Sequence, residues 1–137
     1  MKAVCFGDLL LRLNPFGYEC FTQASAFEAK YTGAEANVAF SLQTFGVETE
    51  FVTKVPTHEI GQAALDYMRK YGISVKNVVR GGDRLGLFYL QKGASQRSGN
   101  VIYDRANSAF TQNLLVATTN VLFPQKNGVR ITSKYLL

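Results

Sequence analysis

A mostly apolar run from residue 2 to residue 13, interrupted by Gly7-Asp8, is the feature that most constrains the fold of this 137-residue chain. A run of this kind is typical of a strand that is buried on both faces of a parallel sheet. Two stretches with helical spacing of apolar residues follow, at 32–45 and 57–71, and a glycine follows each of them. The order of strand, helix, strand and helix predicts βαβ crossovers, and therefore an α/β fold with helices covering a parallel sheet.

The beginnings of both helices carry capping residues. Thr32 and Glu35 have the T-x-x-E spacing of a capping box, so we expect the first helix to begin at Thr32. Thr57 is expected to cap the second helix.

Several shorter segments alternate between large apolar and polar residues, as half-exposed strands do. Four of them do not fit the helix–strand rhythm and are expected to form a separate small sheet, at 19–24, 26–31, 85–91 and 100–103. Two others, at 50–54 and 74–79, are expected in the main sheet. The sequence thus predicts an α/β body with a β flap.

Composition excludes several classes of protein. Apolar residues make up 47% and charged residues 18% of the chain, which suits a packed core and excludes a disordered tail. Neither a membrane-length apolar run nor a signal peptide is evident, so we expect a cytoplasmic protein. The lone His58 and two cysteines without C-x-x-C spacing predict no metal site. The basic residues are scattered, which argues against a nucleic-acid partner.

Charge divides the chain at Ala109. Residues 1–109 carry all ten acidic side chains and twelve basic ones, whereas 110–137 carries three basic residues and no acid. We therefore expect a domain at 1–109 and an atypical basic tail at 110–137. One hypothesis is that the tail is an aberrant end from a truncated or altered reading frame; the alternative is a hairpin around Asn127-Gly128.

The segment Tyr-Thr-Gly-Ala-Glu-Ala-Asn-Val-Ala at 31–39 resembles the first signature of the ribokinase/PfkB carbohydrate kinases. Gly7-Asp8 and Ile60-Gly61 occur in the same order as in that family. Gly-Gly-Asp-Arg-Leu-Gly at 81–86 and Tyr-Asp-Arg-Ala at 103–106 are similar to the 2-keto-3-deoxygluconate kinase branch. The likeness covers residues 4–109.

This resemblance implies a ribokinase-like α/β fold, with part of a Rossmann-like parallel sheet and a small β-clasp lid whose strands lie near 19–31 and 85–105. It implies transfer of the γ-phosphoryl group of ATP, with Mg, to a sugar hydroxyl. It also implies a homodimer formed through the β-clasp. The substrate contacts that it implies are Asp8, Gly33, Ala34, Asn37, Tyr89, Tyr103 and Arg105.

The chemistry of these residues suits an acid sugar, although each has a structural alternative. Asn37 offers a donor and an acceptor to sugar hydroxyls, but it could also face the core of an ordinary capped helix. The planar fork of Arg105 suits a carboxylate, but Arg105 could instead form a surface pair with Asp104 or Glu28. Tyr89 could contact the sugar from the lid or pack within the clasp.

Thr32 departs from the family pattern, because it replaces the first glycine of a Gly-Gly pair. Glycine can adopt positive φ, so its replacement predicts a stiffer lid hinge.

The chain lacks the residues that would perform catalysis in this family. The family has a late Gly-Ala-Gly-Asp turn that cradles ATP phosphates and supplies the base, and no such turn or P-loop occurs in this sequence. We therefore expect no catalytic residue here, no ATP site, and no activity of the chain alone. The alternatives are a sugar-binding module without catalysis and a pairing partner for a full-length kinase.

Overall fold

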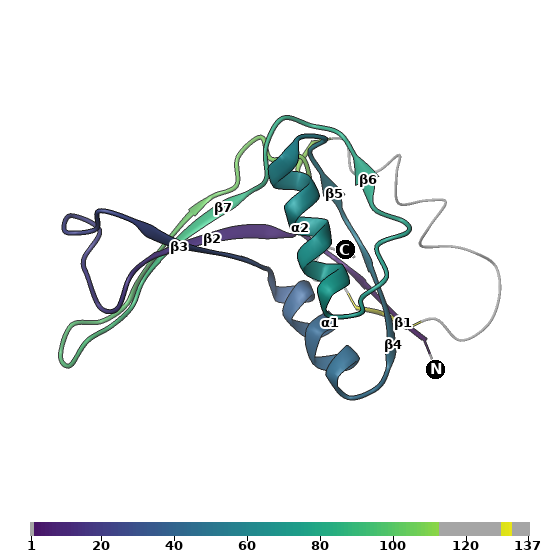
Figure 1. The fold of residues 1–137 in the computed structure, drawn as a ribbon, viewed down its shortest axis with the longest axis horizontal. Helices are drawn as coiled ribbons and strands as arrows, with labels where there is room; N and C mark the ends of the chain where they lie inside the picture. Colours follow the sequence, from purple (N-terminus) through teal and green to yellow (C-terminus); the bar gives the residue numbers. More distant parts are fainter. Residues whose placement is uncertain (1, 113–129, 133–137) are drawn as a thin grey trace.

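The body of the molecule is built on a short parallel sheet (Figure 1). The computed structural model describes residues 2–112 and 130–132. Strands β1 (Lys2–Phe6), β4 (Glu48–Val52) and β9 (Arg130–Thr132) pair in the order β4-β1-β9, all parallel. Strands β5 (Lys54–Val55) and β6 (Val79–Arg80) form a second parallel pair. The predicted strand at 74–79 is thus reduced to β6 and one bridge between Ser74 and Glu50.

Two helices cover one side of these strands and make the core. Helix α1 spans Ala34–Thr44 and helix α2 spans Glu59–Lys70. Ala39 of α1, Met68 of α2 and Phe51 of β4 are fully buried in one apolar cluster between the helices and the sheet. In the described residues neither helix has the length and apolar character needed to cross a bilayer.

Both predicted helix caps are wrong. Gly33 is the N-cap of α1, without a side-chain cap hydrogen bond, because Thr32 is the last residue of a strand and its hydroxyl donates to Asn37 Oδ1 instead (2.7 Å). The Glu35 side chain turns into the protein, where a Cβ at Gly7 would overlap it. His58, rather than Thr57, caps α2: its Nδ1 accepts from the Ile60 N–H (3.2 Å).

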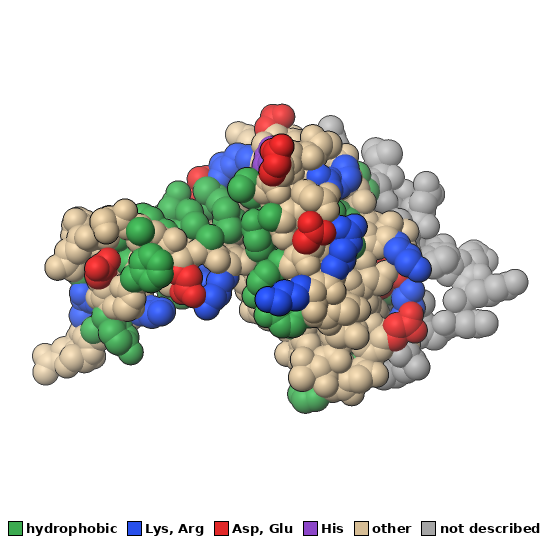
Figure 2. Space-filling view, viewed as in Figure 1, with side chains coloured by type: hydrophobic (Ala, Val, Ile, Leu, Met, Phe, Trp, Pro, Cys, Tyr) green, Lys and Arg blue, Asp and Glu red, His purple; other side chains and the backbone are tan. Residues whose placement is uncertain are grey.

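The flap is a four-stranded sheet, here called the clasp, which projects as an arm from the body (Figures 1 and 2). It consists of β2 (Leu10–Pro15), β3 (Phe27–Thr32), β7 (Leu87–Gln91) and β8 (Asn100–Asp104), in the order β3-β2-β7-β8. The pair β2–β7 is parallel, and the two outer pairs are antiparallel.

One predicted clasp strand is wrong, and its place is taken by another. Residues 19–24 form turns, in which the Gln23 and Ala24 N–H groups both donate to the Cys20 carbonyl. The apolar run at 2–13 breaks after Phe6, so that its first half is β1 of the body and its second half is β2 of the clasp. The predicted strands at 26–31, 85–91 and 100–103 are confirmed as β3, β7 and β8.

Packing of the body continues past Ala109. Ala109 is fully buried, and the Phe110 ring packs on Phe6 with the ring centroids 5.7 Å apart. Backbone pairing of β9 with β1 also places residues 130–132 in the body sheet. The predicted hairpin at Asn127-Gly128 lies outside the described residues, and the aberrant-tail hypothesis stays a prediction.

We predict that Gly33→Ala destabilises the chain by about 1–3 kcal/mol, the usual cost of overpacking. A Cβ at Gly33 would overlap the Asp8 carbonyl oxygen, which belongs to backbone and cannot swing aside. Urea unfolding followed by circular dichroism measures the effect. Gly46→Asn is the control, since nothing lies within 4 Å of that position and Asn tolerates its φ of 77°. Equal stability of Gly33→Ala and the parent chain would contradict the prediction.

Candidate functional site

The site is centred on Asp8, which lies just beyond the carboxyl end of β1, where the chain passes from the body into the clasp. Asp8 is 3% exposed, and its Oδ2 accepts hydrogen bonds from Arg105 Nε and pairs with Nη2, each at 3.1 Å. Arg105 directly follows β8. The fold therefore joins two predicted site residues that are 97 positions apart in sequence.

Neither of the surface partners considered for Arg105 holds it. Asp104 binds Arg84 (2.7 Å), and Glu28 binds Lys30 (2.7 Å). Both of those alternatives are therefore wrong, and Arg105 belongs to the junction between body and clasp.

Burial raises the pKa of the Asp8 carboxyl from 3.8 to about 6. The neighbouring Arg105 opposes this rise in pKa, and the negative charge of Glu35 adds to it. Asp8 can therefore gain or lose a proton close to neutral pH, which few aspartates do.

Two glycines allow the chain to close around the Asp8–Arg105 pair. Gly33 lies against the Asp8 backbone, as described above. A Cβ at Gly86 would lie 3.3 Å from Asp8 Oδ2 and 3.5 Å from Arg105 Cγ. The sequence analysis missed Gly86 as a site residue, although it belongs to the quoted Gly-Gly-Asp-Arg-Leu-Gly segment.

Asn37 lies in the first turns of α1 and is exposed, so the core-facing alternative is wrong. The Thr32 hydroxyl occupies its Oδ1, which leaves the amide nitrogen to donate outward. Ala34 is exposed beside it. Because α1 has no side-chain cap, the N–H groups of its first turn add further donors at this position.

The two predicted tyrosines lie on opposite faces of the clasp. Tyr103 is the cross-strand partner of Phe88, and their ring centroids are 5.7 Å apart. Tyr89 pairs with Ile102 on the other face, where its ring meets Phe27 at 6.4 Å. Because side chains alternate along a strand, Arg105 lies on the face of Tyr103. We call this the Arg105 face of the clasp and the other the Tyr89 face.

The structure thus brings Tyr103 to the face of Arg105 and places Tyr89 in the packing of the opposite face. Phe88 was missed as a residue of the Arg105 face. Alternation along the strand would have identified it only if the register of the β7–β8 pair had been known, and that register depends on a loop without a defining turn motif.

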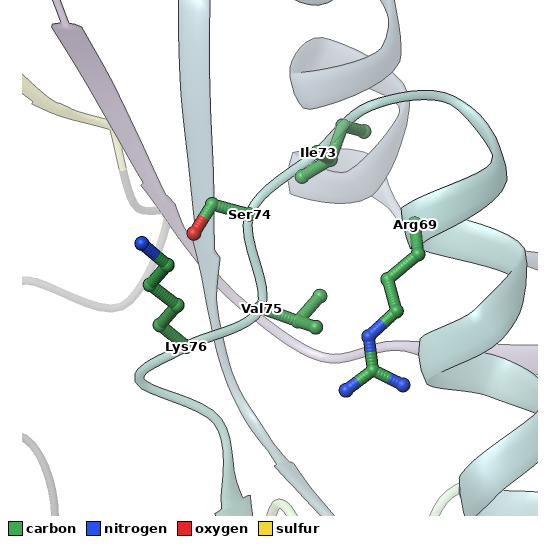
Figure 3. Close-up of a pocket in the computed structure, with 5 residues that line it drawn as sticks. All are labelled: Arg69, Ile73, Ser74, Val75 and Lys76. Atoms are coloured by element: carbon green, nitrogen blue, oxygen red, sulfur yellow. The ribbon is translucent and has the colours of Figure 1, made fainter.

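A pocket of about 270 Å³ lies in the body, away from the Asp8–Arg105 pair (Figure 3). It is lined by Arg69, Ile73, Ser74, Val75 and Lys76. The Ser74 N–H donates to Thr49, which pairs with Ala3 near the beginning of β1, whereas Asp8 follows the end of that strand. The pocket and the Asp8–Arg105 pair therefore lie toward opposite ends of the sheet.

One feature of the described residues concerns a bound metal ion. Among residues 2–112 and 130–132, no three His, Cys, Asp or Glu side chains are grouped so as to hold a cation.

Comparison with known proteins gives a consistent family. A family model for pfkB family carbohydrate kinases matches residues 1–136, and so runs past Ala109. The chain is 36% identical to a 2-dehydro-3-deoxygalactonokinase of Haloferax volcanii over 112 residues, 80% of this chain and 35% of that protein. It is 31% identical to a 2-dehydro-3-deoxygluconokinase of Bacillus subtilis, over 80% of this chain and 34% of that protein.

A solved structure agrees with these relatives. The 2-dehydro-3-deoxygluconokinase of Thermotoga maritima is 45% identical and superimposes with a TM-score of 0.80, over 82% of this chain and 34% of that one. The chain spans about a third of the length of the relatives it matches. Its fold is therefore that of the ribokinase-like kinases, and the chain belongs to the pfkB family of carbohydrate kinases.

Proposed function

We propose that this chain provides the sugar-binding part of an acid-sugar kinase and does not phosphorylate the sugar by itself. The observation that carries the proposal is the convergence of Asp8, Arg105 and the beginning of α1 at one junction between body and clasp. A ligand in an open α/β fold binds beyond the carboxyl ends of the strands, which is where this junction lies.

In this proposal Arg105 holds the sugar carboxylate. A guanidinium group matches a carboxylate with two parallel hydrogen bonds, and Asp8 fixes the direction of the Arg105 side chain. Asn37 donates to a sugar hydroxyl from α1, and Tyr103 adds its hydroxyl from the clasp. The relatives named for 2-dehydro-3-deoxy acid sugars support a ligand of this class, of which 2-keto-3-deoxygluconate (2-dehydro-3-deoxygluconate) is the first to test.

Phosphoryl transfer from ATP belongs, in this proposal, to a complete kinase of the family. Residues 2–112 and 130–132 offer no group of side chains for a metal ion, and the sequence has no Gly-Ala-Gly-Asp turn, so the proposal assigns the positioning of ATP to the complete kinase. No catalytic residue is therefore assigned.

We predict that the chain binds 2-keto-3-deoxygluconate without ATP and that adding ATP and Mg produces no ADP. Arg105→Gln should weaken binding at least about tenfold, because hydrogen bonds to charged groups contribute about 1.5–3 kcal/mol. Titration calorimetry measures the affinity, and a coupled assay measures ADP. Arg84→Gln is the matched control, since it also removes a guanidinium that is paired with an aspartate, in this case Asp104 rather than Asp8. Absence of binding, or clear ADP production, would refute the proposal.

We also predict that the affinity for the acid sugar falls as the pH rises through about 6. Below that value Asp8 is protonated, and above it Asp8 is an anion that competes with the sugar carboxylate for Arg105. The sugar itself stays ionised from about pH 5 to about pH 7.5, so the change comes from the protein. Calorimetry across this range should show the decline, and Asp8→Asn should abolish it. An affinity independent of pH in the parent chain would count against the role of Asp8.

The clasp supports a second candidate function, association with another copy of the chain. Its Tyr89 face exposes Phe27 (40%) and Ile102 (48%) beside the Tyr89 ring. Apolar side chains exposed together on a sheet are typical of an interface.

We expect Ile102→Glu to convert a dimer into a monomer, because it would bury a charge between two clasps. Val101→Glu is the control: Val101 is similarly exposed (44%), but it lies on the opposite face of the same strand. Light scattering coupled to size exclusion gives the molecular mass. A parent chain that is monomeric at high concentration would exclude this function.

A further inference from the structure

Arg12, which lies in the middle of β2, is a cation of the Arg105 face that the proposed function does not use. The Cβ position at Gly86 meets the Leu10 side chain as well as Asp8 and Arg105, so Leu10 belongs to the Arg105 face. Arg12 is two residues further along the same regular strand and therefore lies on the same face.

A continuous row of side chains crosses the clasp at Arg12. Strand register pairs Lys30 with Arg12, Arg12 with Phe88, and Phe88 with Tyr103. Arg105 lies one row closer to the body. The Cα atoms of Arg12 and Arg105 are two strand spacings apart across the sheet and two residues apart along it, which corresponds to about 12 Å. Two long side chains at this separation can reach one ligand placed between them.

The charge of Arg12 is not balanced within the described part of the chain. Its Nε is buried without a hydrogen-bond partner, and none of the ion pairs formed among residues 2–112 includes Arg12. Lys30, directly opposite, is also a cation, but Lys30 is paired with Glu28 at 2.7 Å. Tyr67 lies within electrostatic range of Arg12, and a phenol carries no charge at neutral pH.

This arrangement is unfavourable without a ligand. Two like charges directly opposite each other in a ladder destabilise the pair of strands, and a buried N–H without a partner costs free energy. An anion on the Arg105 face would relieve both costs, since it would accept from the guanidinium group and offset the second cation. The aromatic ring of Phe88 beside Arg12 would shield such a contact from water.

We propose that Arg12 is a further ligand-binding residue, which together with Arg105 holds the carboxylate of an acid sugar and selects it over a neutral sugar. This inference rests on the proposed function. It extends that function from one cation to two, and it makes Arg12 a determinant of ligand class.

The test compares the parent chain with Arg12→Gln and Lys30→Gln by calorimetry. Arg12→Gln should lower the affinity for 2-keto-3-deoxygluconate at least about tenfold and should leave the affinity for fructose, a neutral ketohexose, unchanged. Lys30→Gln should change the affinity less than about twofold, because Glu28 already engages that ammonium group. Equal losses of affinity in the two variants would indicate that any positive charge on this face attracts the ligand, and would overturn the inference.

The thermal midpoint distinguishes a binding role from a structural one. Arg12→Gln should melt at the same temperature as the parent chain or higher, since it removes a like-charge pair; a clear decrease would show that Arg12 supports the fold and would overturn the inference. If the parent chain binds the acid sugar and Arg12→Gln binds it equally well, only this inference fails. If the parent chain binds no acid sugar, the proposed function fails first.

Discussion

The ion pair between Asp8 and Arg105 is the interaction on which the rest of this structure depends. It joins the end of β1 in the body to the end of β8 in the clasp, and Asp8 is buried at that junction. Removing Arg105 would leave the Asp8 carboxylate buried without its cation, which is more costly than losing a surface pair. Protonation of Asp8, whose pKa is raised to about 6, would therefore weaken this link between the clasp and the body.

The local patterns of the sequence were sufficient to locate most helices and strands, but not to predict which strands pair with one another. Helical spacing and the two terminal glycines located α1 and α2, and alternation located β3, β7 and β8. The run at 2–13 was predicted as one strand, although its two halves belong to different sheets. An apolar strand of the body and an apolar strand of the clasp have the same sequence pattern, so the pattern does not show where one ends and the other begins. Thr32 failed as a cap for a related reason: its place in the β3 ladder, which no local motif encodes, sets the direction of its hydroxyl.

The site was predictable to the extent that it lies on helix and strand ends. The family resemblance implied Asp8, Gly33 and Asn37, and the rule that ligands gather beyond the carboxyl ends of parallel strands predicted a site in the same place. The sequence did not predict which side chains lie on which face of the clasp, because a shift of one residue in strand register moves every side chain to the other face. Tyr89 and Phe88 are neighbours with similar side chains, and only the pairing of β7 with β8 decides which one shares a face with Tyr103. The burial of Glu35 was not predicted, because its spacing from Thr32 matches that of a capping box.

The same register explains why the two faces of the clasp differ in chemistry. The Tyr89 face gathers aromatic and aliphatic side chains, whereas the Arg105 face carries the cations Arg12, Lys30 and Arg105. Two acids engage the last two of these: Glu28 pairs with Lys30, and Asp8 pairs with Arg105 at the junction. A sheet with one apolar and one cationic face can associate through the first while it binds an anion with the second. Because the strands are common to both faces, a contact on one face would hold the backbone that positions the other. Association of the clasp and binding of an acid sugar are therefore expected to favour each other.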